Sequence, residues 1–280
     1  MGTLTGVGTV DRISCAPVDH DTLTTMFAGL RGQERRVRRP PPDGRGGLLL
    51  AEGARVVQRC LGAGHHLRAL LVSTAYAGPL PSPAVPTLHL DPDAIQRLTG
   101  FGAMREMLGA FDRPPDPTAA EVLAAAARVL VLEGVANPSN VGTIIRSATA
   151  LGVDATLLGP GSADPFGRRA LRTSMGAALA HPWAITDDPL ADCRGHGFTI
   201  LALTPAADAV PLPEALTAMP GGRIALMLGA EGPGLSPAVL DAADARVTIP
   251  MAAGVDSLNV AAAAAVACWL LSGPGDRPGR

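Results

Sequence analysis

The stretch IPMAAGVDSLNVAAAAAVACWLL, residues 249–271, joins a polar loop to a long apolar run. Of the 14 residues 258–271, 13 are apolar, and Asn259 is the exception. A membrane-spanning helix needs about 20 apolar residues, and the glycines and prolines of the following SGPGDRPGR end a helix. We therefore expect a helix buried in a folded core. Asp256, Ser257 and Asn259 cluster at its start, where Ser257 is either an N-cap or part of a site.

Upstream of this helix, short apolar segments alternate with helical ones. We expect strands at residues 128–132, 153–158, 198–203, 224–228 and 246–249, and a helix in NPSNVGTIIRSATALG. Strands that alternate with helices predict an α/β fold with a mostly parallel sheet.

A second, smaller α/β unit precedes this one. Strands are expected at residues 48–51 and 67–73 and in TLHL, with helices over 54–61 and over 92–98 and Asp91 as the N-cap of the latter. The proline-rich FDRPPDPTAAE, residues 111–121, reads as a linker. The sequence thus predicts a domain at residues 1–117 and another at 118–280.

Charge and composition narrow the class of protein. The chain is 47% hydrophobic with a net charge of −2, which is not typical of a disordered protein. RGQERRVRRPPPDGR, residues 31–45, carries six arginines and is either a phosphate-binding arm or a solvated loop. The four cysteines form no CxxC pair, so no metal site is expected. No signal peptide is evident, and we expect a cytoplasmic protein without a membrane segment.

Three polar stretches lie at the ends of expected strands, where open parallel sheets bind ligands. In EGVANPSNVGTIIRSA, Asn140 suits an N-cap, while Gly142 and Arg146 share a helix face on which glycine lets another chain or a substrate approach. LMLGAEGPGLS surrounds Glu231 with glycines that permit close backbone approach to a ligand. The third stretch is the DSLN that precedes the alanine-rich helix.

In this order, NPSNVGTIIRSA, LGAEGPGLS with IPM, and DSLNVAAAAA resemble the three motifs of the SpoU/TrmH family of SPOUT-class RNA methyltransferases. The resemblance covers roughly residues 128–271, and Ala261 stands where the family often has serine. LLLAEGARVV resembles part of the ribosomal-protein-like domain that many members carry. The resemblance implies a C-terminal trefoil knot, a homodimer, S-adenosylmethionine as cofactor, and methyl transfer to a ribose 2′-hydroxyl of RNA.

The resemblance also implies roles for single residues. The catalytic pocket would hold Asn140, Arg146, Glu231, Ser257 and Asn259. The cofactor would contact Gly229, Ile249 and Leu258, with Leu203 and Met251 close by. Because a guanidinium stays protonated, Arg146 is better suited to hold a phosphate and polarise the hydroxyl than to act as a base.

Three alternatives stay open at this point. A non-catalytic RNA-binding protein would not need the polar pocket residues, and a methyltransferase for small molecules would not need the basic arm. The RNA is either ribosomal or transfer RNA, and the additional N-terminal domain favours ribosomal RNA.

Overall fold

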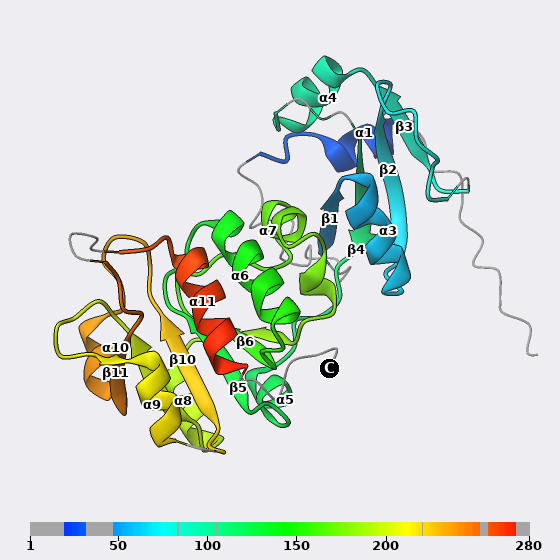
Figure 1. The fold of residues 1–280 in the computed structure, drawn as a ribbon. Coiled ribbons are helices and arrows are strands. Elements are labelled where there is room, and N and C mark those ends of the chain that lie inside the picture. The colour runs from blue at the N-terminus through cyan, green and yellow to red at the C-terminus, as the bar shows by residue number, and fades with distance from the viewer. Residues whose placement is uncertain are drawn as a thin grey trace, which may run out of the picture.

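The computed structural model describes residues 20–31, 47–82, 84–102, 104, 106–219, 221–252 and 257–272. Most of the arginine-rich segment, and Asp256, lie outside the described residues. Figure 1 shows two α/β parts, one built on a four-stranded sheet and one on a seven-stranded sheet.

The N-terminal sheet is mixed, with the strand order β1-β4-β2-β3. β1 (Leu48–Glu52) and β2 (Leu67–Ser73) each pair antiparallel with β4 (Met107–Asp112), and β3 (Thr87–Leu90) runs parallel to β2. The helices are α1 (His20–Phe27), α3 (Ala54–Gly62) and α4 (Pro92–Thr99). Asp91 caps α4 by accepting a hydrogen bond from the Ala94 N–H at 2.8 Å, which confirms the predicted cap.

The linker interpretation of residues 111–121 is only partly right. Phe111 and Asp112 complete β4, and Ala119–Leu123 form α5. Thr118 and Glu121 close a reciprocal capping box at the start of that helix. Residues 113–118 form no helix or strand.

The C-terminal sheet has seven parallel strands in the order β7-β6-β5-β10-β8-β11-β9. Its strands are β5 (Arg128–Leu132), β6 (Ala155–Leu158), β7 (Trp183–Ile185), β8 (Thr199–Leu203), β9 (Val210–Pro211), β10 (Ile224–Leu228) and β11 (Ala245–Thr248). The α/β class and the parallel sheet are therefore confirmed. The five expected strands are present within a few residues, whereas the short β7 and β9 at the two edges escaped prediction.

Helices cover both faces of this sheet because alternate residues of its strands point to opposite sides. In β5, Leu130 and Leu132 belong to the core shared with α6 (Pro138–Ala150), α9 (Leu212–Ala218) and α11 (Val260–Leu271). Val129 and Val131 belong to the other core, with α5, α8 (Pro189–Gly195) and α10 (Pro237–Ala242).

The alanine-rich helix α11 packs on α6, and the two lie side by side in Figure 1. Its small buried residues Ala261, Ala264 and Ala267 permit this close packing, so the expectation of a core helix holds. The predicted cap at Ser257 is wrong. Asn259 caps the helix, because its side-chain oxygen accepts hydrogen bonds from the Ala261 and Ala262 N–H groups at 2.9 and 3.4 Å. Within the described part of the chain, no helix has the length and apolarity to cross a membrane.

The two parts meet where α7 (Arg168–Thr173) packs on β1. Glu52, the last residue of β1, accepts hydrogen bonds from Arg168 and Arg172 of α7. Arg113, which follows β4, forms a buried ion pair with Asp164 at 2.7 Å. Charged pairs therefore join the N-terminal sheet to the C-terminal part, and those of Arg113 with Asp164 and of Arg168 with Glu52 have little solvent exposure.

Candidate functional site

A cavity of about 400 Å³ opens at the carboxyl ends of β8, β10 and β11. Because these strands are parallel, the three loops that follow them meet at one edge of the sheet. The cavity is lined by Leu203, Thr204, Pro205, Leu228, Gly229, Ala230, Glu231, Gly232, Gly234, Thr248, Ile249, Met251, Ser257, Leu258, Asn259, Val260 and Ala263. Eight of the ten site residues expected from the sequence are among them.

The glycine-rich turn after β10 needs glycine for its own backbone. A Cβ at Gly229 would lie 2.1 Å from the carbonyl carbon of Gly234 and 2.2 Å from the Leu235 nitrogen. Gly232 and Gly234 adopt left-handed φ angles of 90° and 74°, which side chains disfavour. Gly229 is therefore required by the returning arm of the turn, whose atoms lie beside it, and it also lines the cavity.

Asn259 links this turn to the start of α11. Its amide Nδ2 donates to Oε1 of Glu231 at 3.4 Å, while its Oδ1 caps the helix. The two contacts fix which end of the amide faces the turn. They also keep the exposed Glu231 carboxylate at the cavity, where it places a negative charge.

Sequence reasoning missed Glu133, which holds the far end of the same turn. Its carboxylate accepts hydrogen bonds from the Ser236 N–H at 2.8 Å and from the Ser236 hydroxyl at 2.7 Å. Its backbone N–H donates to the Leu228 carbonyl at 2.9 Å, beside the cavity. The available signal was its position as the first residue after an apolar strand, at the edge where parallel sheets bind ligands.

The structure places Asn140 and Arg146 on α6, and neither lines the cavity. The cap of α6 is Asn137, whose side chain accepts from the Ser139 N–H at 2.9 Å, so the N-cap interpretation of Asn140 is wrong. Asn140 is 9% exposed, and its Nδ2 has no hydrogen-bond partner among the described residues. Arg146 is exposed, and no described residue forms an ion pair with it.

Gly142 allows α7 to pack on α6. A Cβ at this position would lie 2.3 Å from the Ala170 carbonyl oxygen and 2.1 Å from the Thr173 hydroxyl. The sequence left open whether another stretch of chain or a substrate comes close to this glycine. The structure shows a stretch of chain, helix α7. The contact brings α7 beside the turn of α6 that carries Arg146.

The titratable groups outside the cavity suit structural roles. Burial raises the thiol pKa of Cys60, Cys193 and Cys268 to about 12, so these thiols stay protonated and are weak nucleophiles. Among the described residues, no three His, Cys, Asp or Glu side chains group in a way that holds a metal ion.

The chain is similar to known proteins of one family. Residues 127–269 match the family described as SpoU rRNA Methylase. The chain is 45% identical over 240 residues to an uncharacterized tRNA/rRNA methyltransferase of Mycobacterium tuberculosis, with 83% of each chain covered. It is 29% identical over 230 residues to the 23S rRNA (guanosine(2553)-2′-O)-methyltransferase RlmP of Bacillus subtilis, covering 80% of this chain and 88% of the relative.

A solved structure has the same fold. The AdoMet-bound rRNA methyltransferase from Sinorhizobium meliloti matches with a TM-score of 0.67 and 24% identity, covering 80% of this chain and 87% of that one. The likeness extends over most of both chains, so it includes more than the segment that matches the family.

Proposed function

The chain belongs to the SpoU rRNA methylase family, and from this premise we propose that it transfers a methyl group from S-adenosylmethionine to a ribose 2′-hydroxyl of ribosomal RNA. One observation carries the proposal. The cavity at the carboxyl ends of β8, β10 and β11 gathers eight of the ten residues for which the family resemblance implies a place at the site.

The cavity fits the cofactor in size and in chemistry. Small-molecule sites typically measure 300–1,000 Å³ and combine apolar walls with a few polar groups. Leu203, Ile249 and Leu258 supply apolar surface for the adenine, and Gly229 lines the same cavity. S-adenosylmethionine supplies an activated methyl group when bound. Its use by a relative of this fold supports the assignment.

The side chains of the site orient the RNA and bind its phosphate. Arg146 binds the phosphate next to the target ribose and polarises the 2′-hydroxyl, because its planar guanidinium suits bidentate contact with phosphate. Asn259 and Ser257 position that hydroxyl, with Asn259 held by Glu231. Asn140 supports the pocket from α6, where its amide Nδ2 has no hydrogen-bond partner in the described part of the chain. Methyl transfer would form the bond from the 2′-oxygen to the methyl carbon and break the bond from that carbon to the sulfonium sulfur, with S-adenosylhomocysteine as the leaving group and the hydroxyl proton passing to solvent.

We also propose that the two parts of the chain have separate roles. Residues 1–117 form an RNA substrate-binding domain with the arginine-rich arm, and 118–280 form the methyltransferase domain with a trefoil knot around the cofactor. The chain acts as a homodimer. Val266 and Trp269 of α11 support this assignment, because they are 39% and 49% exposed and place apolar surface beside α6.

Methyl transfer from radiolabelled S-adenosylmethionine tests the proposal, with total rRNA and total tRNA offered separately. We expect label in rRNA, and its loss in Arg146→Ala. Label confined to tRNA would reassign the substrate. Cofactor binding without transfer to either pool, or to assembled ribosomal subunits, would favour a non-catalytic RNA-binding protein.

Arg146→Lys separates bidentate contact from charge alone. We expect a loss of turnover close to that of Arg146→Ala, because an ammonium group cannot grip a phosphate through two parallel bonds. Near-normal turnover of the lysine variant would contradict the bidentate role.

A further inference from the structure

Two stretches of chain far apart in sequence carry arginines and no acidic residue. Residues 54–73 contain Arg55, Arg59 and Arg68, and residues 165–186 contain three more arginines, within α7. The whole chain has 25 acidic residues against 23 basic ones. Both stretches are therefore far more positively charged than the chain as a whole.

The structure brings these stretches together. The Arg59 guanidinium of α3 donates to the carbonyl of Met175, just after α7. Gly176 then turns with a φ of 78°, and a Cβ on it would lie 3.1 Å from Cδ of Arg59. The Arg168 and Arg172 contacts with Glu52 fix α7 to the strand that precedes α3. Helices α3 and α7 are therefore held in a fixed relation.

Two arginines stay outside this network. Arg55, one turn before Arg59 on α3, and Arg169 on α7 are exposed, and no described residue forms an ion pair with either. Arg169 lies one turn before Thr173, which packs against Gly142. Arg146 follows one turn after that glycine on α6. The exposed cations thus lie on three adjoining elements.

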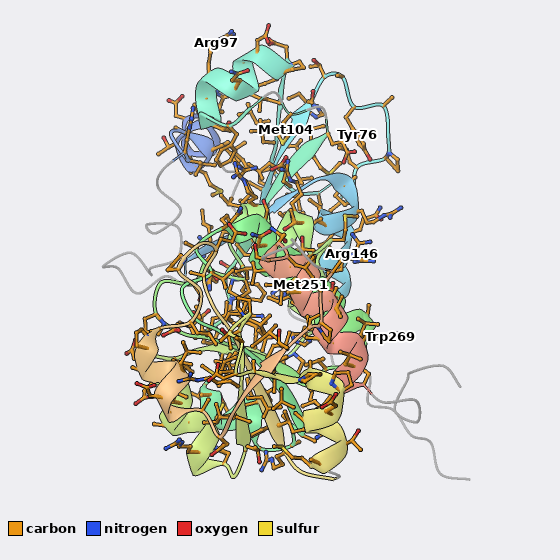
Figure 2. All side chains as sticks on the ribbon, turned by 60° about the vertical axis from the view of Figure 1, so that its left-hand side comes forward. Tyr76, Arg97, Met104, Arg146, Met251 and Trp269 are labelled. Carbon is orange, nitrogen blue, oxygen red and sulfur yellow. The ribbon has the colours of Figure 1, made fainter. Side chains whose placement is uncertain are left out.

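The carboxylates of Glu52 and Glu106 are outnumbered here by the five arginines of α3 and α7. Glu52 accepts from two arginines, and Glu106 accepts from the Ala54 N–H at 2.8 Å at the start of α3. In Figure 2, Arg146 lies between α3 and the N-terminal half of α11. The surface therefore keeps a net positive charge beside the residue that the proposed mechanism needs.

We propose that Arg55 and Arg169, with Arg59 and Arg172, form a phosphate-binding face that holds the RNA backbone beside the target nucleotide. This inference rests on the proposed function and adds the path of the substrate. The N-terminal and C-terminal parts of the chain would both bind one RNA strand. This contact would hold the N-terminal part in a fixed position relative to Arg146. Guanidinium groups bind phosphate oxygens strongly through two parallel hydrogen bonds.

The chemistry of the face favours nucleic acid over a protein partner. The large apolar side chains exposed in the described part of the chain are Leu80, Val210, Leu258, Val266 and Trp269, and none lies on α3 or α7. Protein interfaces centre on buried apolar and aromatic residues. Nucleic-acid binding depends instead on cations that displace condensed counterions from phosphates.

The test is the salt dependence of RNA binding by an Arg55→Gln/Arg169→Gln variant, with deproteinised bacterial 16S and 23S rRNA as the probe. Each lost phosphate contact lowers the slope of log affinity against log salt by about 0.7 for single strands. We expect the slope to fall by about 1.4, KM for RNA to rise about tenfold, and kcat and S-adenosylmethionine affinity to stay unchanged. Arg97→Gln is the matched control, because Arg97 is exposed on α4 and lies far from Arg146 in Figure 2.

The outcomes separate this inference from the proposed function. A double variant with wild-type slope and KM overturns the face and leaves an acidic protein as the partner for these charges. A wild-type chain that binds RNA with the expected salt dependence but transfers no methyl group refutes the activity and keeps the face. A wild-type chain without salt-dependent RNA binding overturns both.

Discussion

Replacing Gly229 by alanine should damage the cofactor cavity from within its own wall. The added Cβ would lie 2.1 Å from the Gly234 carbonyl carbon, 2.2 Å from the Leu235 nitrogen and 2.4 Å from the Gly234 oxygen. All three are backbone atoms, so no side-chain rotation can relieve the contact. The turn has to open instead, and both Gly229 and Gly234 line the cavity.

The size of the effect follows from these distances. Non-bonded carbons reach their optimum at about 3.5–4.0 Å, so the returning arm has to move by roughly 1 Å or more. Overpacking that forces a backbone shift typically costs about 1–3 kcal/mol. With three backbone atoms involved, we expect a loss of about 2–3 kcal/mol in the free energy of unfolding. S-adenosylmethionine affinity should fall at least tenfold, which corresponds to about 1.4 kcal/mol.

Urea denaturation and calorimetric titration with S-adenosylmethionine measure both effects. Gly222→Ala is the matched control, because a Cβ there meets only the Met219 oxygen, at 3.8 Å. It should unfold and bind like wild type. A Gly229→Ala protein with wild-type stability and cofactor affinity would refute the steric argument and the placement of the cofactor beside this turn.

Three further predictions concern other parts of the chain. Gly142→Ala should lower stability by about 1–3 kcal/mol in urea denaturation despite the better helix propensity of alanine, because its Cβ would overlap the Ala170 carbonyl; a stabilised variant would contradict the packing of α7 on α6. Burial lowers the pKa of His181 to about 4, so stability should be lost as pH falls from 6.5 to 4, by about 3 kcal/mol in total. His181→Gln should remove that part of the pH dependence of stability measured by chemical unfolding. An unchanged pH profile would exclude His181 as the group responsible. Val266→Arg should convert a dimer to a monomer in analytical ultracentrifugation, whereas Leu80→Arg, at a similarly exposed apolar position, should not; a Val266→Arg dimer would exclude the α11 face as the interface.

The sequence predicted the central strands well because their apolar runs are long and buried on both faces. RVLVL and IALML coincide with β5 and β10 residue for residue. The edge strands β7 and β9 have three and two residues, too few for any periodicity to identify them. Their positions depend on pairing with β6 and β11.

Helix starts were predicted less well because several polar residues compete for each cap. Asn137 is followed by Pro138, which suits the first turn of a helix, and this pair marks the start of α6 better than Asn140 does. Asn259 rather than Ser257 starts α11, since its oxygen reaches two backbone N–H groups.

The candidate site was predicted from the order of three motifs at strand ends, and the segments of two of them, after β10 and β11, meet at the cavity. The contact of Glu133 with Ser236 joins residues more than 100 positions apart, so no local pattern could indicate it. The roles assigned to Asn140 and Arg146 stay predictions, because both residues lie on α6 outside the cavity.

The most direct test of the central claim is the chemical position of the transferred methyl group. Ribosomal RNA labelled by the wild-type chain with radioactive S-adenosylmethionine would be hydrolysed completely in alkali. A 2′-O-methyl group blocks cleavage at its own nucleotide, so the account predicts that the label appears in alkali-resistant dinucleotides. Label in mononucleotides would show methylation of a base and would contradict the account.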